Sequence, residues 1–351
     1  MDGSLRSRRS LGKKLAFAAA TVLLGLLALE GALRLLGLPR GLVRSFSRAW
    51  NRDPESLARL PGLFQPSAEL AIAVPPELAY RVRTNALGLR GPELGPRTPG
   101  TLRVLALGDS VTFGYHVADG ETWPALLEAR LRGGGRAAEV INGGCGHFSL
   151  PDERLYATER LLSLEPDVVV LQFCSNDVLE SELLRDPPLY RKILAEAAEG
   201  TSLGDRLRGT ALGELQLRVA IALKGAGHEP AAALSPLQEV GDAAWARWEE
   251  ELAGLAAELA ARRVPLVLVS FPDLVTALEP ASQGYDARLA AIAARQGVPF
   301  RGALQAFRTA GPDPRQLYLW PRDAHPCGRG TAVLSGVVGE LLRERGLLAP
   351  R

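Results

Sequence analysis

Between residues 102 and 346, short apolar segments alternate with longer segments of helical periodicity. A short, continuously apolar run is typical of a strand that is buried on both faces. Strands that alternate with helices favour a parallel sheet, joined by right-handed crossovers and covered by helices on both faces. The expected strands are residues 102–107, 139–142, 168–173, 265–271 and 298–300, and the expected helices are residues 123–131, 151–164, 243–263, 285–296 and 328–345. We therefore expect an α/β domain built on a five-stranded parallel sheet.

The first expected strand leads directly into Gly108, Asp109 and Ser110. Glycine permits a sharp turn that a Cβ atom would obstruct. Ser110 then lies at the carboxyl end of a strand, where open α/β sheets bind their ligands. This position makes Ser110 a candidate nucleophile, and Asp109 is expected to shape the turn.

A serine hydroxyl becomes a good nucleophile only when a base accepts its proton. Among the four histidines, His325 is the best candidate, because it lies in the loop before the last helix and Asp323 is two residues upstream. Asp323 could hold the imidazole in the tautomer whose free nitrogen faces Ser110. The alternative is that Asp323 merely caps the last helix. His116 and His228 are expected to be solvated, and His147 is expected to be a turn residue, with a substrate-facing polar group as the alternative.

Acyl transfer to serine also requires hydrogen-bond donors for the developing oxyanion. Asn176 follows the buried strand 168–173, so its amide lies at the same sheet edge as Ser110. Gly146 lies in the glycine-rich loop after the second strand and could offer a backbone N–H at close range. The alternative for both residues is an ordinary turn.

Four sequence blocks together resemble the SGNH (GDSL) hydrolase superfamily: Gly108-Asp109-Ser110, Asn142-Gly143-Gly144-Cys145-Gly146, Asn176-Asp177 and Asp323-Ala324-His325-Pro326. The resemblance covers about residues 102–346 and implies a three-layer α/β/α, flavodoxin-like fold. It also implies Ser110 as nucleophile, His325 as base and Asp323 as its orienting acid, with no metal or other cofactor. The implied oxyanion donors are the N–H groups of Ser110 and Gly146 and the Asn176 side chain.

The chain departs from the family pattern at three positions. Arg322 stands where the family has its aspartate, so Asp323 is one residue closer to the histidine. Cys174 replaces the glycine that usually begins the third block. His147 aligns with the family glycine, so either Gly146 or His147 supplies the oxyanion N–H.

The N-terminus combines a basic tail, residues 1–14, with an apolar stretch from Leu15 to Leu36. Its 22 residues compare with about 20 needed to span a bilayer. We favour an uncleaved membrane anchor over residues 15–38, a feature similar to a membrane-tethered bacterial branch of the superfamily. A cleaved secretory signal and a core helix are the alternatives. The positive-inside rule predicts a cytoplasmic N-terminus and an exported catalytic domain.

The rest of the chain divides into a linker and lead-in segment, residues 39–100, and a hydrolase domain, residues 101–351. Within the lead-in, residues 84–91 are turn-like and are interpreted as an irregular approach to the first strand. Residues 178–240 are too long for an ordinary loop, which favours a cap-like insertion with its own helices, such as residues 189–198 and 212–223. A solvated surface excursion is the alternative.

These features predict a membrane-anchored serine esterase that deacylates an exported ester, such as an acetylated glycan or a lipid. An O-acyltransferase on a cell-surface polymer, using the same residues, and a non-catalytic relative are the alternatives. The net charge of +2 is too small to indicate a nucleic-acid partner. Each of the three cysteines adjoins a catalytic block, as a buried apolar residue or as part of a disulfide: Cys145, Cys174 and Cys327.

Overall fold

The computed structural model describes residues 3–37, 51, 53–60, 62–74, 78–146, 148–178, 210–213, 215, 216, 219, 240–320 and 323–350. The chain divides into two compact units. The first comprises Met1–Arg44, Ile72–Ala79 and Gly200–Leu223, and the second comprises Ser45–Ala71, Tyr80–Glu199 and Lys224–Arg351.

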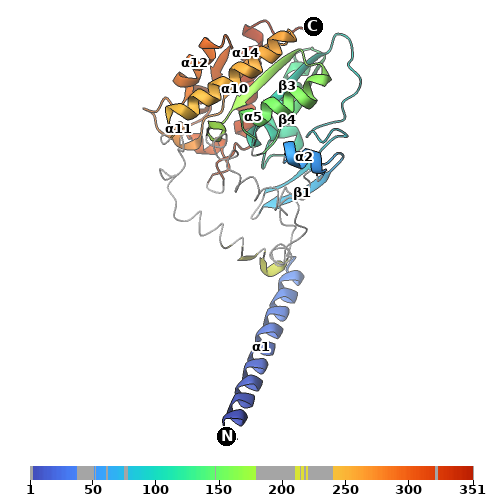
Figure 1. The fold of residues 1–351 in the computed structure, drawn as a ribbon, viewed down its shortest axis with the longest axis vertical. Helices are drawn as coiled ribbons and strands as arrows, with labels where there is room; N and C mark the ends of the chain where they lie inside the picture. Colours follow the sequence, from blue (N-terminus) through green and yellow to red (C-terminus); the bar gives the residue numbers. More distant parts are fainter. Residues whose placement is uncertain are drawn as a thin grey trace. The chain divides into compact units, whose positions relative to one another are not determined.

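The first unit contains the long helix α1 (Gly3–Leu35) (Figure 1). Its segment Ala16–Leu35 is long and apolar enough to cross a membrane, and almost all of it is exposed. Glu30 interrupts the apolar stretch and forms an ion pair with Arg34 at 2.8 Å. The Glu30 carboxylate also accepts hydrogen bonds from the backbone N–H groups of Ala211 and Leu212. The one acidic side chain of this segment is therefore paired.

Within the described part of the second unit, five parallel strands form one sheet in the order β4-β3-β5-β6-β7. The strands are β3 (Leu102–Gly108), β4 (Ala138–Gly144), β5 (Val168–Phe173), β6 (Leu266–Ser270) and β7 (Phe300–Gly302). Counted along the chain, this order is 2-1-3-4-5, as in flavodoxin-like folds. The direction of winding reverses between β3 and β5, and ligands of such folds bind at that point.

Side chains that alternate along the strands pack into two hydrophobic cores, one on each face of the sheet. On β3, Leu105 and Leu107 belong to one core, whereas Val104 and Ala106 belong to the other. The first core includes residues of α5 (Leu150–Tyr156), α10 (Asp242–Ala261) and α12 (Asp286–Arg295), and the second includes residues of α4 (Trp123–Gly133), α11 (Leu274–Leu278), α13 (Leu304–Thr309) and α14 (Gly328–Glu344) (Figure 1). The three-layer α/β/α architecture predicted from the sequence is confirmed.

Two expected elements differ in detail from those observed. The expected helix 151–164 ends as α5 at Tyr156 and continues as a π-turn, η3 (Ala157–Leu161), and a 3₁₀ turn, η4 (Leu162–Leu164). The last strand begins at Phe300, because the preceding residues complete the end of α12. Gly297 has a φ of +66°, and the Val298 N–H donates to the Ala293 carbonyl at 2.8 Å. This hydrogen-bond pattern is a Schellman cap.

The lead-in segment has more regular structure than the sequence indicates. It contains α2 (Pro54–Arg59) and two paired strands, β1 (Glu69–Val74) and β2 (Leu78–Arg83). The following turn is organised by Asn85, whose Oδ1 accepts the N–H groups of Leu87 at 2.9 Å and Leu89 at 3.1 Å. Residues 84–91 thus form a turn, as the sequence indicates, and one side chain accepts two of its N–H groups.

Most of the insertion at residues 178–240 lies outside the described residues. The expected helix 189–198 is not among them, whereas residues 212, 213, 215, 216 and 219 are described and are helical. The remaining short elements of the second unit are α3 (Ser110–Phe113), η2 (Asp119–Glu121) and η7 (Pro314–Leu317).

Candidate active site

The candidate nucleophile begins the one-turn helix α3, directly after β3. Gly108 has a φ of +154°, and a Cβ atom there would lie 2.2 Å from Thr112 Oγ1. Asp109 is the N-cap of α3, since its Oδ1 accepts the Val111 N–H at 2.9 Å. As the sequence indicates, Asp109 shapes the turn, and the glycine allows the close approach that presents Ser110 at the sheet edge.

The structure brings Ser110, His325 and Asp323 together. Ser110 Oγ lies 2.8 Å from His325 Nε2. Asp323 Oδ1 is hydrogen-bonded to His325 Nδ1 and also accepts the His325 backbone N–H at 2.7 Å. The last helix, α14, begins at Gly328 with Cys327 as its N-cap. The alternative in which Asp323 caps this helix is therefore wrong.

The loop that carries His325 is held by backbone hydrogen bonds to the segment before it. The Leu319 N–H donates to the His325 carbonyl at 3.0 Å, and the Cys327 N–H donates to the Leu317 carbonyl at 2.9 Å. These bonds form a short antiparallel bridge between Tyr318 and Pro326, the residue directly after His325. The ring therefore reaches Ser110 from a braced backbone.

The pKa values of the two carboxyl groups near Ser110, Asp323 and Asp109, are shifted in opposite directions. Burial by itself would raise the pKa of Asp323, but hydrogen bonds from His116 and His325, together with the charges of these rings, hold it well below its usual range. Burial raises the pKa of Asp109, although the Val111 N–H, His325 and two side-chain hydrogen bonds oppose the change. Asp323 is therefore the carboxyl that stays ionised and can orient a histidine.

The two expected oxyanion donors follow neighbouring regions of the sheet: Asn176 begins a short helical segment, residues 176–178, after β5, and Gly146 follows β4. The Asn176 side chain is hydrogen-bonded to the carboxylate of Asp109, the residue before the candidate nucleophile. Gly146 lies in the turn after β4, and a Cβ atom there would lie 2.0 Å from the Tyr115 hydroxyl. His147, the alternative N–H donor, lies outside the described residues.

His116 is a site residue that sequence reasoning missed. Its side chain is 19% exposed, and its Nε2 lies 3.5 Å from Asp323 Oδ2. On its other side, Nδ1 lies 3.3 Å from the hydroxyl oxygen of Tyr80. The expectation that His116 is solvated is therefore wrong. Its position six residues after Ser110 was the signal available in the sequence. His228 lies outside the described residues.

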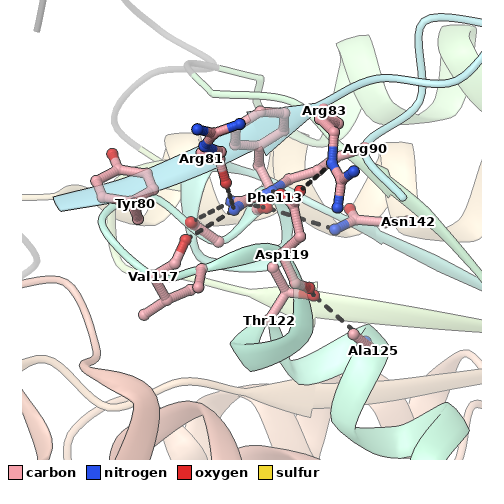
Figure 2. Close-up of polar contacts among 12 residues, drawn as sticks. Tyr80, Arg81, Arg83, Arg90, Phe113, Val117, Asp119, Thr122, Ala125 and Asn142 are labelled. Carbon is pink, nitrogen blue, oxygen red and sulfur yellow. Dashed lines mark hydrogen bonds and ion pairs between the residues drawn. The ribbon is translucent and has the colours of Figure 1, made fainter. Parts of the chain in front are cut away.

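Arg90, the last polar residue of the lead-in turn, is buried against the loop that follows α3 (Figure 2). Its guanidinium donates to the carbonyls of Phe113 at 3.1 Å, Gly114 at 2.5 Å and Val117 at 2.7 Å. It also forms an ion pair with Asp119 at 3.0 Å. The lead-in segment is thereby connected to the end of the helix that begins with the candidate nucleophile.

All three cysteines are described, and all three are free thiols. Cys145 is buried, whereas Cys174 and Cys327 are partly buried. The disulfide considered from the sequence is therefore absent, and burial beside the catalytic blocks accounts best for Cys145.

One group of described side chains has the donor types and spacing of a metal site. The ligand atoms of His116, Asp323 and His325 all lie within 4.8 Å of one another. Both ring nitrogens of His325 are already engaged, one by Asp323 and the other by Ser110. A metal ion bound through His325 would therefore compete with those contacts.

Comparisons with known proteins show the family to which the chain belongs. The model of the GDSL-like Lipase/Acylhydrolase family matches residues 106–333, well over half of the chain. No curated protein sequence matches the chain.

Solved structures that resemble the chain include a lipase/acylhydrolase from Enterococcus faecalis, with 15% identity and a TM-score of 0.42 over 70% of this chain and 96% of that one. Another is TesA, with 16% identity and a TM-score of 0.43 over 69% of this chain and 98% of that one. A third is a two-domain esterase active on acetylated mannans, with 14% identity and a TM-score of 0.42 over 70% of this chain and 49% of that one. By the family match, the chain belongs to the GDSL-like lipase/acylhydrolases and is an ester-hydrolysing enzyme.

Proposed function

We propose that this chain is a membrane-anchored serine esterase in which Ser110 is the nucleophile, His325 the general base and Asp323 the residue that orients it. The observation that supports this proposal most strongly is the continuous hydrogen-bonded row from Ser110 Oγ through the His325 ring to Asp323 Oδ1. A neutral imidazole has one donor and one acceptor nitrogen. Because Nδ1–H faces the ionised Asp323, Nε2 is the acceptor that faces Ser110.

In the proposed reaction, His325 Nε2 takes the Ser110 proton as Oγ attacks the ester carbonyl carbon. The imidazolium then donates that proton to the departing alkoxide, which leaves an acyl group on Ser110. A water molecule, deprotonated by His325, attacks the acyl carbon and releases the carboxylic acid and the free serine. Asp323 keeps its negative charge throughout and stabilises the imidazolium in both steps.

We assign the oxyanion hole to the Ser110 N–H, the Gly146 N–H and the Asn176 side-chain amide. The hydrogen bond between Asn176 and Asp109 supports this assignment, because it holds the amide next to the nucleophile. The contact between Gly146 and Tyr115 supports a backbone donor at close range, because no side chain fits at that position.

The proposed substrate is an exported ester, such as an acetylated glycan or a lipid. The support comes from the N-terminus, where a basic tail precedes the candidate membrane span in α1. By the positive-inside rule, this order of charges favours a cytoplasmic N-terminus and a catalytic unit on the far side of the membrane.

Replacing the nucleophile tests the proposed triad. Ser110→Ala should lower the turnover of p-nitrophenyl acetate on the order of 10⁴-fold or more, because no other group can form the acyl-enzyme. A fluorophosphonate probe should label the wild type at Ser110 and leave the variant unlabelled. Turnover of the ester by Ser110→Ala at the wild-type rate would refute the proposal.

An acyl-chain series then defines the substrate. p-Nitrophenyl esters from acetate to palmitate, assayed at equal concentration, separate a deacetylase from a lipase by the chain length with the highest kcat/KM. Adding an acceptor sugar and analysing the products separates hydrolysis from O-acyl transfer, since only transfer yields an acylated sugar.

A further inference from the structure

The ionised acid of the proposed triad has a second histidine on its other oxygen. Asp323 Oδ1 serves His325, whereas Asp323 Oδ2 lies 3.5 Å from His116 Nε2. The Asp323 side chain is 34% exposed and belongs to a loop, so water competes for the oxygen that His325 does not use. A carboxylate in such a place needs a further partner if it is to keep one orientation.

The hydroxyl of Tyr80 lies where it can select the nitrogen of His116 that carries the proton. The Tyr80 oxygen accepts the His116 backbone N–H at 3.2 Å and lies 3.3 Å from His116 Nδ1. Burial raises the pKa of Tyr80 to about 12, so the phenol keeps its proton at neutral pH. Tyr80 can then donate that proton to Nδ1, which leaves the proton of a neutral His116 on Nε2, facing Asp323.

The backbone of His116 is held in an unusual conformation. Its φ of +66° lies in the left-handed region, which is strained for a non-glycine residue. Arg90 braces the loop on both sides of His116 by its hydrogen bonds to the carbonyls of Gly114 and Val117 (Figure 2). These contacts from the lead-in segment hold the loop in the conformation in which the imidazole lies beside Asp323.

We propose that His116, oriented by Tyr80, is a positioning residue that holds Asp323 in line with His325. The inference rests on the proposed function, since it assigns a role toward the triad. It extends the active site to β2 and the lead-in turn, which precede the region that the family model matches. The described groups that face the His116 ring are Tyr80, Tyr115, Asp323 and His325.

A matched pair of substitutions tests whether Asp323 needs the N–H donor of His116 or only a side chain that fills the space of its ring. His116→Gln keeps an N–H donor near the position of Nε2, whereas His116→Leu removes it. Neither glutamine nor leucine is favoured at positive φ, so both variants bear a similar backbone cost. The purified full-length chain in detergent is assayed with p-nitrophenyl acetate, and the melting temperature of each variant is measured in parallel.

We expect His116→Leu to lower kcat about tenfold to hundredfold, the effect of losing one charge-assisted hydrogen bond, with KM changed less than about twofold. His116→Gln should restore kcat to within about threefold of the wild type. Tyr80→Phe should lower kcat less than His116→Leu, because the imidazole stays but its tautomer is no longer selected. Wild-type kcat in His116→Leu, or equal losses in the leucine and glutamine variants, would overturn the inference.

Two measurements distinguish this inference from the proposed function itself. If the fluorophosphonate probe does not label Ser110 in the wild type, the proposed triad fails. If Ser110 is labelled and Ser110→Ala is inactive while His116→Leu behaves as the wild type, only the role of His116 fails.

Discussion

At the scale of single residues, Asp109 is both a hydrogen-bonded helix cap and a buried carboxyl, and the two have conflicting effects on its ionised form. As the N-cap of α3 it accepts the Val111 N–H, and it also contacts Asn176 and Ser110. Its side chain is buried, and burial raises the pKa of the carboxyl. The ionised form therefore carries a desolvation cost in the folded state that is absent in the unfolded state.

This conflict predicts a pH-dependent difference between the wild type and Asp109→Asn. Asparagine caps helices as well as aspartate does but has no charge to bury. A carboxyl whose folded pKa is raised favours the folded state at low pH, and this contribution is lost as the pH rises through the folded pKa. The free energy of unfolding of the wild type, relative to Asp109→Asn, should therefore rise as the pH falls from about 8 to about 4.

Urea denaturation of both proteins at several pH values measures this difference directly. Titrations that the two proteins share cancel in the comparison, so the trend reports on position 109. A difference that stays constant over the range, or that grows in favour of the variant at low pH, would contradict the assignment of Asp109 as a buried carboxyl with a raised pKa.

At the scale of elements, α3 is a single turn that cannot hold its conformation alone. Neighbouring elements secure it. Thr112 Oγ1 donates to Gln172 Oε1 on β5 at 2.7 Å and accepts the Trp123 Nε1–H at 3.2 Å. On the opposite side, Gly144 of β4 approaches so closely that a Cβ atom there would lie 2.2 Å from the Phe113 nitrogen. The position of Ser110 is thus a product of β3, β4, β5 and α4 together.

Arg90 connects the lead-in segment to α3 and to the loop after it. Its planar guanidinium is essential, because it donates to three carbonyls at once. Arg90→Lys keeps the charge but can reach only some of the carbonyls of Phe113, Gly114 and Val117. Since the Arg90 side chain is 1% exposed, the abandoned carbonyls stay buried. We expect a loss of about 2–5 kcal/mol in the free energy of unfolding.

The matched control is Arg81→Lys, on β2. Arg81 is 73% exposed and forms a surface ion pair with Glu69 at 2.8 Å, an interaction that contributes little to stability. Thermal unfolding of both variants should therefore show a large decrease for Arg90→Lys and none beyond experimental error for Arg81→Lys. Equal melting temperatures for the two variants would contradict the bracing role of Arg90.

At the scale of the whole molecule, the two compact units differ in how they place their apolar side chains. The first contains an apolar helix with nearly all of its candidate span exposed, and the second contains the sheet and its two cores. An exposed apolar helix of this length is unfavourable in water and favourable in a bilayer. We therefore expect the full-length chain to fractionate with membranes and to resist extraction by carbonate at high pH.

Removal of residues 1–38 tests this expectation without touching the catalytic unit. The truncated protein should remain in the soluble fraction and should hydrolyse p-nitrophenyl acetate with the kcat of the detergent-solubilised full-length chain. Recovery of the full-length protein in the carbonate supernatant would contradict an uncleaved anchor, and a shortened N-terminus found by sequencing would indicate a cleaved signal.

The sequence by itself determined the features that depend on local pattern. Apolar runs separated by helical segments predict the five strands and their flanking helices. A strand buried on both faces is continuously apolar, and a helix that packs on a sheet is apolar at helical spacing, so both patterns are visible in neighbouring residues. Gly108, Ser110 and the pair Asp323 and His325 were likewise recognisable, because polar residues directly after strands or before the last helix meet at one sheet edge.

Only the tertiary structure decided the roles of Tyr80, Arg90 and His116. Each is an ordinary residue in its own segment, and its role arises from contacts with residues far along the chain, as with His116 and Asp323. Such contacts depend on how loops lie over the sheet edge, and no periodicity encodes them. The candidate nucleophile could therefore be proposed from its own neighbours in sequence, whereas the residues that support it required the packed fold.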